Sequence, residues 1–277
     1  MRTSNSVLAK NGIMALMLAA ATALGCTTGA FRDESAPEDQ YHPSGKDGIR
    51  VMVDTIADIN RKSPESYSLD FNIDGTYGEK KNKMLGSMEF NRKQRTMHVS
   101  VVDFIFRSPV MTLLQEGDVI RIYYPVEKKM YVDNVRTIDM ANYGGVSIDF
   151  RMFYDLITGV IPLISGYSVK QGLAANNGKG SMLILENPNY YQTISFRGNN
   201  PDKILLINRK TRERIEIYVK NPVGQGASRI YSNVMIVAQR VPLRLEITFK
   251  KIQLNAAVKV KTYKDMRLPD GLKVIQM

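Results

Sequence analysis

The chain has 277 residues, of which 44% are hydrophobic and 23% are charged, so it holds enough apolar material for a folded core. Its one cysteine excludes an internal disulfide and a zinc site built on cysteines, and its two histidines exclude a histidine-rich metal site. The formal net charge of +11 favours anionic surfaces such as phospholipid headgroups, lipopolysaccharide or nucleic acid, although a soluble basic protein fits the same charge.

The N-terminal segment, residues 1–25, is typical of a secretory signal peptide. Arg2 and Lys10 precede an apolar run over residues 12–25, which is shorter than the roughly 20 residues of a membrane-spanning helix. The run ends in Ala-Leu-Gly-Cys, which resembles the bacterial lipobox, where a small residue precedes a cysteine that becomes lipidated. We therefore expect acyl chains to be attached at Cys26. The alternative is a buried cysteine in an ordinary signal helix.

A polar segment rich in Pro, Gly and Ser follows over residues 26–47, which predicts a flexible stalk between the anchor and a single domain over residues 48–277. His42 lies in this stalk, so only His98 is left for a site in the folded domain. The domain opens with an amphipathic helix over residues 48–62, where apolar residues recur at helical spacing.

Alternating polar and apolar residues then predict a meander of antiparallel strands, interrupted once by a second helix over residues 147–157. The expected strands cover residues 67–75, 84–90, 95–106, 111–115, 119–124, 130–134, 181–187, 190–197, 203–208, 212–220, 228–238, 243–250 and 255–263. Some of these segments are short, and we expect about ten or eleven strands in the fold. The protein is therefore predicted to be mainly β, a barrel or strongly curved sheet with a helix against its inner face.

The chain carries little that indicates catalysis. Gly224-Gln225-Gly226 lacks the third glycine of a dinucleotide-binding loop, and in Gly178-Lys179-Gly180-Ser181 a glycine separates the lysine from the serine. His98 alternates with Ser100 on a predicted strand, so it is expected to face solvent or the barrel rim. We expect no enzymatic activity, no cofactor and no metal. The basic residues form no aromatic-basic motif, and with export this disfavours nucleic acid.

The inner face is the remaining candidate site. Side chains of one parity on two neighbouring strands and on one face of the second helix point to the same interior. We expect them to line an apolar cavity for acyl chains: Leu69, Phe71, Met88, Phe90, Phe150 and Phe153. Methionine-rich strands suit a surface that accommodates varied apolar shapes, but a plain filled core would show the same composition.

Four segments together resemble the LolA/LolB family of lipoprotein-localisation proteins, and most of all its outer-membrane receptor branch, LolB. They are residues 67–75 (YSLDFNIDG) after the first helix, 107–118 (RSPVMTLLQEGD), 149–162 (DFRMFYDLITGVIP) and 241–249 (VPLRLEITF). The ending, residues 268–274, is similar to that of the family's soluble carrier. The likeness spans about residues 48–277, and it implies an unclosed antiparallel barrel with helices packed against or capping the concave face.

The resemblance also implies a function. The family's cavity takes the acyl chains of lipoproteins, and an apolar residue on an exposed loop assists delivery to the membrane. Val110 stands at that loop position here, followed by Met111 where the family has glycine. We thus expect a monomeric chaperone-like protein, anchored by lipid on the periplasmic face of the outer membrane. Its partners would be lipoprotein acyl chains or phospholipid, a periplasmic LolA-like carrier and the membrane surface.

Two other functions stay open on the sequence. A structural or sensory envelope lipoprotein of the same fold, with a filled core, would bind a protein partner and no lipid. A lipid hydrolase is disfavoured because only one histidine remains for a catalytic site. Thr27 follows the cysteine in place of the aspartate that signals inner-membrane retention in enteric bacteria, which favours the outer membrane.

Overall fold

The computed structural model describes residues 41–135, 138, 150–226, 228–240 and 242–276. The predicted signal peptide and Cys26 lie outside these residues, so cleavage and lipidation stay predictions. Within the described ranges, none of the helices has the length and hydropathy needed to cross a membrane.

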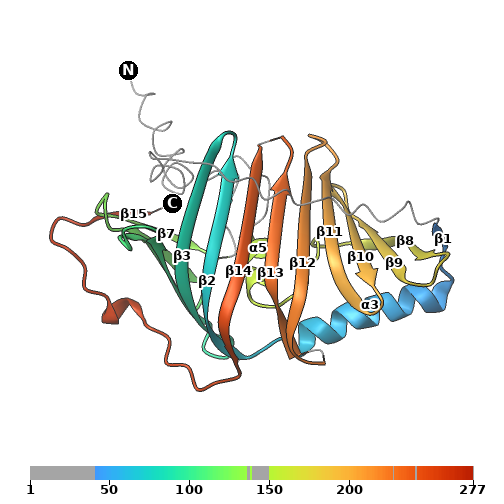
Figure 1. Ribbon diagram of the computed structural model, residues 1–277, viewed down its shortest axis with the longest axis horizontal. Helices are drawn as coiled ribbons and strands as arrows, with labels where there is room; N and C mark the ends of the chain where they lie inside the picture. Colours follow the sequence, from blue (N-terminus) through green and yellow to red (C-terminus); the bar gives the residue numbers. More distant parts are fainter. Residues whose placement is uncertain (1–40, 136–137, 139–149, 227, 241, 277) are drawn as a thin grey trace.

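One sheet of 15 strands makes up most of the described chain (Figure 1). The spatial order is β1-β8-β9-β10-β11-β12-β13-β14-β2-β3-β4-β5-β6-β7-β15. The strand bounds are β1 Tyr41–Pro43, β2 Ser66–Tyr77, β3 Lys80–Asn91, β4 Thr96–Asp103, β5 Pro109–Glu116, β6 Val119–Tyr124, β7 Lys129–Asn134, β8 Ser168–Ala175, β9 Gly180–Glu186, β10 Tyr190–Arg197, β11 Asn200–Asn208, β12 Arg214–Gln225, β13 Ser228–Ala238, β14 Leu243–Leu254 and β15 Lys273–Gln276.

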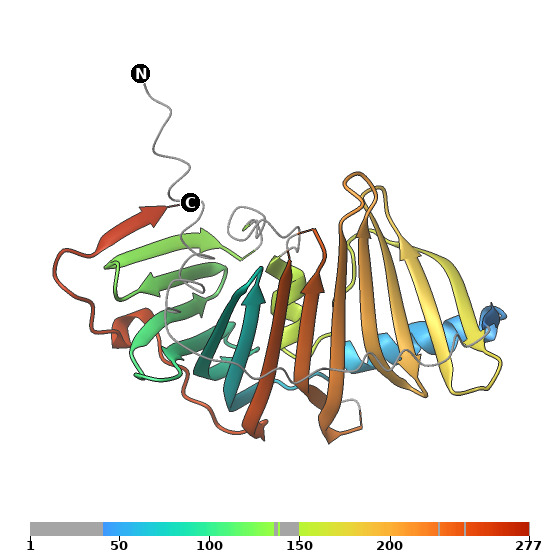
Figure 2. The same cartoon turned by 45° about the horizontal axis from the view of Figure 1, so that its top comes forward.

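Two meanders join in the middle of this sheet. The strands from β8 to β14 form one run, those from β2 to β7 form the other, and β14 pairs with β2 over most of its length. Every pairing is antiparallel except that of β15 with β7, which is parallel. The sheet curves around a concave face without closing, as Figure 2 shows from a second direction. The expected unclosed, mainly β fold is thereby confirmed.

Both α-helices lie on the concave side. Helix α3, Lys46–Arg61, buries Met52, Ile56 and Ile59 against the half of the sheet that contains β8 and β9. It approaches β8 so closely that a Cβ on Gly172 would lie 2.6 Å from the Ile49 side chain. Helix α5, Phe150–Ile157, lies behind β13 and β14 in Figure 1 and packs toward the other half. Each half of the sheet therefore has its own helix.

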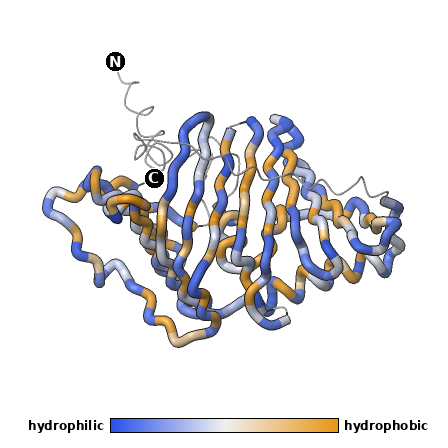
Figure 3. The backbone as a smooth tube through the Cα atoms, in the orientation of Figure 1, coloured by the Kyte–Doolittle hydropathy of each residue, from blue (hydrophilic) through white to orange (hydrophobic). Residues whose placement is uncertain are grey.

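Alternation along the strands separates the two faces of the sheet, which Figure 3 shows as alternating orange and blue along each strand. In β2, for example, Tyr67, Leu69, Phe71 and Ile73 are buried, while the residues between them are partly exposed. Because side chains in a strand point alternately to opposite faces, the buried set forms one continuous apolar concave surface.

The structure has more strands than the ten or eleven expected. Strands β1 and β15 are only three and four residues long, too short for a periodic pattern, and β8 reads SVKQGLAA without alternation. Tyr41–Pro43 and the start of α3 also place residues 41–47 in the fold, within the segment expected to be stalk.

Two expected strand segments are wrong. Residues 255–263 form an extended connection that leads into a short 3-10 helix, Tyr263–Asp265, and they add no strand because β14 already pairs with β13 and β2. Strand β4 ends at Asp103, and Phe104–Phe106 form an exposed turn and not the end of the strand.

Candidate functional site

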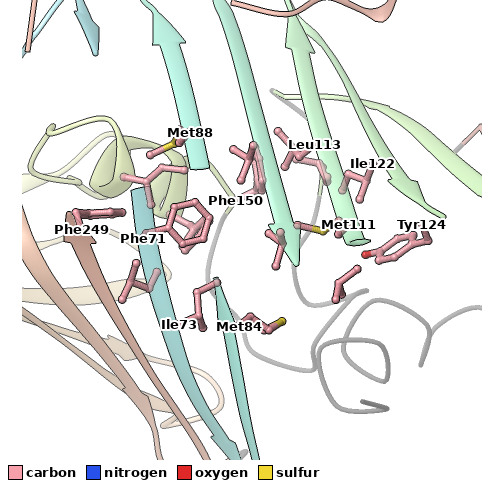
Figure 4. A pocket seen from close by; sticks show the side chains of 17 residues that line it. Phe71, Ile73, Met84, Met88, Met111, Leu113, Ile122, Tyr124, Phe150 and Phe249 are labelled. Atoms are coloured by element: carbon pink, nitrogen blue, oxygen red, sulfur yellow. The ribbon is translucent and has the colours of Figure 1, made fainter. Parts of the chain in front are cut away.

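An apolar cavity lies between α5 and the concave face of the sheet, in the half that contains β2 to β6 (Figure 4). Its volume is about 130 Å³. Seventeen side chains line it: Phe71, Ile73, Met84, Met88, Val99, Val101, Val110, Met111, Leu113, Ile122, Tyr124, Ile138, Phe150, Phe153, Ile157, Ile247 and Phe249. In Figure 4, Phe71 and Phe249 lie on one side of the cavity and Ile122 and Tyr124 on the other.

The lining limits what the cavity can do chemically. None of its side chains is charged, and Tyr124 alone carries a hydroxyl group. No cluster of histidine, cysteine or carboxylate side chains able to hold a metal occurs in the described part of the chain. Empty cavities of this kind stay dry and bind apolar molecules, since water would find too few polar partners there. The arrangement therefore suits an apolar ligand.

Gly86 makes room for one wall of the cavity. It pairs with Phe71 across β2 and β3, and a Cβ on it would lie 2.2 Å from the Phe71 ring and 2.5 Å from the Ser100 carbonyl oxygen. The Phe71 ring therefore lies over the glycine. It meets Phe249 edge to face at a centroid distance of 6.4 Å, a geometry that aromatic pairs prefer.

Four of the six side chains predicted to line the cavity do so: Phe71, Met88, Phe150 and Phe153. Leu69 and Phe90 do not. Both are buried, but they lie further along the same strands, where Tyr67 and Tyr154 fill the interior with ring centroids 5.1 and 6.3 Å from that of Phe90. The concave face is thus filled core at one end and a cavity at the other.

The C-terminal end of α5 is tied down by one buried and one partly buried hydrogen bond. The Tyr67 hydroxyl donates to the Ile157 carbonyl at 2.8 Å, and the Arg92 guanidinium donates to the Thr158 carbonyl at 2.9 Å. Burial, together with the neighbouring Tyr154, raises the pKa of the Tyr67 phenol, so the hydroxyl keeps its proton and remains a donor.

The segment after α5 is held in the same way by two amide side chains. Asn60 of α3 bonds both the N–H and the carbonyl of Ile161, at 2.7 and 3.0 Å. Gln192 of β10, fully buried, donates to the Pro162 carbonyl at 2.7 Å and accepts the Ile164 N–H at 3.0 Å. The backbone from Ile157 to Ile164 is therefore fixed on both halves of the sheet.

The prediction that Val110 is exposed on a loop is wrong. Its side chain is 9% exposed and lines the cavity beside the half-buried Met111. The register of β4 and β5 shifts between Val101 and Val102, which leaves Val110 as an extra residue between two paired positions. Such a bulge lets two consecutive side chains turn to the same face, here the interior.

The exposed apolar residues lie instead on the β4–β5 turn. Phe104, Ile105 and Phe106 are 45%, 70% and 79% exposed. The Asp103 carboxylate accepts the N–H groups of Ile105 and Phe106 at 2.9 and 2.7 Å, which fixes the turn. An aspartate whose side chain accepts a hydrogen bond from the backbone two residues later is a common turn signal. Asp103 directly precedes this apolar run, so the sequence contained that signal.

His98 is also placed differently from the expectation. It is 9% exposed, on the face opposite the cavity, with its Nδ1 3.6 Å from a Glu89 carboxylate oxygen. The connection after β14 lies here, since the Lys261 N–H donates to the same carboxylate. Burial lowers the pKa of His98, although Glu89 opposes this. The imidazole is not among the side chains that line the cavity, and it is part of the packing on the outer face of the sheet.

Comparison with known proteins shows the fold. No family model matches the sequence, and no curated protein matches it. Solved structures do: a LolA superfamily protein of Nitrosomonas europaea (TM-score 0.51, 7% identity) covers 75% of this chain and 94% of its own. An outer membrane lipoprotein-sorting protein domain of Vibrio parahaemolyticus (0.53, 11%) and a DUF1329 family protein of Desulfovibrio piger (0.55, 10%) each cover 77% and 94%.

The chain shares its fold with these three solved structures, one of which is a LolA superfamily protein. At these sequence identities the likeness shows the fold alone and does not indicate a ligand or a partner for this chain. The receptor branch that the sequence resembles is not among these structures, so the closer resemblance to LolB stays a prediction.

Proposed function

We propose that this protein is a lipid-anchored envelope protein that binds acyl chains in the cavity beneath α5. The observation that supports this most is the lining of seventeen side chains, uncharged throughout, on a concave sheet that could have been filled as it is around Phe90. Each CH₂ group moved from water into such a lining contributes about 0.8 kcal/mol. A chain of sixteen carbons therefore gains about 12 kcal/mol before the cost of ordering it.

Binding of a long acyl chain in this cavity would require α5 to move. A volume of about 130 Å³ is close to that of an engineered cavity of roughly 150 Å³ that holds a benzene molecule, so a long acyl chain needs more room. The helix is tied down after Ile157, whereas Phe150 and Phe153 line the cavity near its other end. Ligand entry would then swing the N-terminal part of α5 away from the sheet about the fixed segment.

The exposed turn supports delivery to a bilayer. Asp103, its first residue, pairs with the cavity-lining Met84, so the turn continues from the end of strands that line the cavity. Aromatic and aliphatic side chains at such a position enter the boundary between headgroups and acyl chains. Phe104, Ile105 and Phe106 take the role that the sequence suggested for Val110.

The finer function follows from the predicted anchor at Cys26. A protein held on the periplasmic face of the outer membrane and able to take up acyl chains suits the sorting or insertion of lipoproteins. A LolA-like carrier would supply the chains. Such a transfer needs two cavities of similar affinity, because a much tighter donor would not release its cargo.

Lipid binding is tested on the full chain with Cys26→Ala, which has no acyl chains of its own. Native mass spectrometry should find co-purified lipid, and a fluorescent fatty acid should be displaced by palmitate. Val99→Trp, which fills the cavity, should abolish both, whereas Thr193→Trp on the opposite face of the sheet should not. Absence of lipid and of displacement in the Cys26→Ala chain would favour the protein-binding alternative.

A further inference from the structure

Three hairpin turns lie side by side at the cavity end of the sheet: β2–β3, β4–β5 and β6–β7. Met84 pairs with Asp103, the last residue of β4, so residues 80–83 of β3 extend beyond β4 and pair with β2 alone. The β4–β5 turn therefore lies along the free edge of this protruding hairpin. On its other side, β6 ends at Tyr124, and the β6–β7 turn follows next to the start of β5.

Basic side chains flank the apolar turn on both sides. We use the term basic rim for Lys80, Lys81, Lys83, Arg107 and Lys128, all of them exposed. Lys83 lies 3.2 Å from Asp74, and the Arg107 guanidinium lies over the Phe104 ring at 5.9 Å. Within the described residues, Lys80, Lys81 and Lys128 form no ion pair, so their charges face solvent.

The acidic side chains of the same turns do little to offset this charge. The Asp103 carboxylate is turned back onto the N–H groups of its own turn, and Glu127 pairs with Lys129 at 2.6 Å. That leaves Glu79, which is exposed at the tip of the β2–β3 hairpin. An exposed apolar centre of Phe104, Ile105, Phe106 and Val126, the last 79% exposed, thus lies within a cationic border.

We propose that the basic rim binds the headgroups of anionic phospholipids and holds the cavity end of the sheet against a negatively charged bilayer. An anionic bilayer fits both parts of this surface. Its phosphate groups bind the lysine and arginine side chains, and the acyl region beneath them accepts the apolar centre. A soluble polyanion would satisfy the charges alone. The inference rests on the proposed function, because an anionic bilayer would be the surface to which the protein delivers acyl chains.

The test uses the full chain with Cys26→Ala, so that no acyl anchor contributes to binding. Co-sedimentation should show binding to vesicles of phosphatidylcholine in which about one lipid in three is phosphatidylglycerol. Lys80→Glu with Lys81→Glu should weaken it at least about tenfold. The matched control is Lys93→Glu with Lys179→Glu, two exposed lysines in turns at the opposite edge of the sheet, with the same change in net charge.

The outcomes of this test are as follows. Loss of binding in the rim variant alone, and loss in about 1 M salt, where charges are screened beyond about 3 Å, support the proposal. An equal loss in both variants would show a response to net charge and overturn it. Equal binding to vesicles of phosphatidylcholine alone, or binding to lipopolysaccharide micelles without binding to the anionic vesicles, would overturn it too. Displacement of the fluorescent fatty acid should be unchanged in the rim variant, which separates this test from that of the cavity.

Discussion

The hydroxyl of Tyr67 on β2 donates a hydrogen bond of 2.8 Å to the carbonyl of Ile157, the last residue of α5, in a fully buried position. This bond joins the sheet to the helix that covers the cavity. It lies at the filled end of the concave face, beside Phe90, and so it holds the helix without occupying the space for a ligand. The bond engages the backbone of Ile157, whose side chain lines the cavity, so it anchors α5 at the border between the filled core and the cavity.

Tyr67→Phe removes this bond and leaves a buried carbonyl without its donor. We expect the free energy of unfolding to fall by about 1–3 kcal/mol, as measured by urea denaturation. We also expect the fluorescent fatty acid to dissociate faster, because the fixed end of α5 is loosened. Tyr190→Phe, at a position outside the cavity lining, serves as the control. An unchanged dissociation rate with the expected loss of stability would show that this tie does not govern entry.

Gly86→Ala should destabilise the fold, because the added Cβ would lie 2.2 Å from the Phe71 ring and 2.5 Å from a backbone carbonyl oxygen. Overpacking of this kind costs about 1–3 kcal/mol. Phe71→Leu in the same chain should recover part of the loss, since it removes one of the two clashes. If the double variant is no more stable than Gly86→Ala, the backbone contact alone carries the strain.

The two ends of the concave face should respond differently to truncation. Phe90→Ala opens a hole in filled core and should cost about 3–5 kcal/mol, with little effect on ligand affinity. Phe150→Ala enlarges a space that already exists, so we expect a smaller loss of stability and an altered preference for acyl-chain length. Thermal unfolding and displacement by fatty acids of increasing length measure the two effects. A full core-type loss for Phe150→Ala with unchanged lipid binding would favour a filled core.

Val110 and Phe106 make a matched pair for the membrane-facing turn. Val110→Glu places a carboxylate in the apolar cavity and should lower the free energy of unfolding by at least about 2 kcal/mol. Phe106→Glu changes a side chain that is 79% exposed, so the melting temperature should barely move, while transfer of acyl chains to liposomes should weaken. Normal transfer by Phe106→Glu would remove the turn from the mechanism.

His98 makes stability depend on pH. Burial lowers its pKa in the folded state, so between the folded and unfolded pKa values the unfolded chain binds more protons. The stability this residue contributes is therefore fully present above its unfolded pKa of about 6.5 and is lost as the pH falls through the folded value. His98→Gln should flatten the decrease in melting temperature below about pH 6.5. An equally steep decrease in the variant would assign it to other groups.

The alternation of polar and apolar residues predicted the central strands of the sheet well and the strands near its edges poorly. Alternation in β2, where Leu69 and Phe71 are buried and Asp70 lies between them, identifies both the strand and its inner face. Strand β8 shows no alternation, because the register shift between Val169 and Gln171 leaves Lys170 as an extra residue and because α3 approaches too closely for a side chain at Gly172. Its place in the sheet depends on a helix from another part of the chain, which local pattern does not reveal.

The sequence predicted which face of the sheet holds the cavity, but not how far the cavity extends along the strands. Parity shows that Leu69 and Phe71 share a face, yet only Phe71 lines the cavity, since where the interior is filled depends on Tyr67, Tyr154 and the path of α5. Val110 was misplaced for a related reason. A bulge changes parity by one residue, and no sequence pattern before it marks the position where the register shifts.

The position of β1 sets how far an anchored molecule could reach. β1 is the outermost strand at one end of the sheet, and β4, which leads into the exposed turn, lies ten strand spacings away, or about 48 Å along the curved sheet. The fifteen residue-to-residue steps from Cys26 to Tyr41 span at most about 50 Å when fully extended. If Cys26 is lipidated, the tether is nearly as long as the sheet is wide. The exposed β4–β5 turn could then contact the membrane that holds the anchor, or it could point away from that membrane toward a carrier in the periplasm.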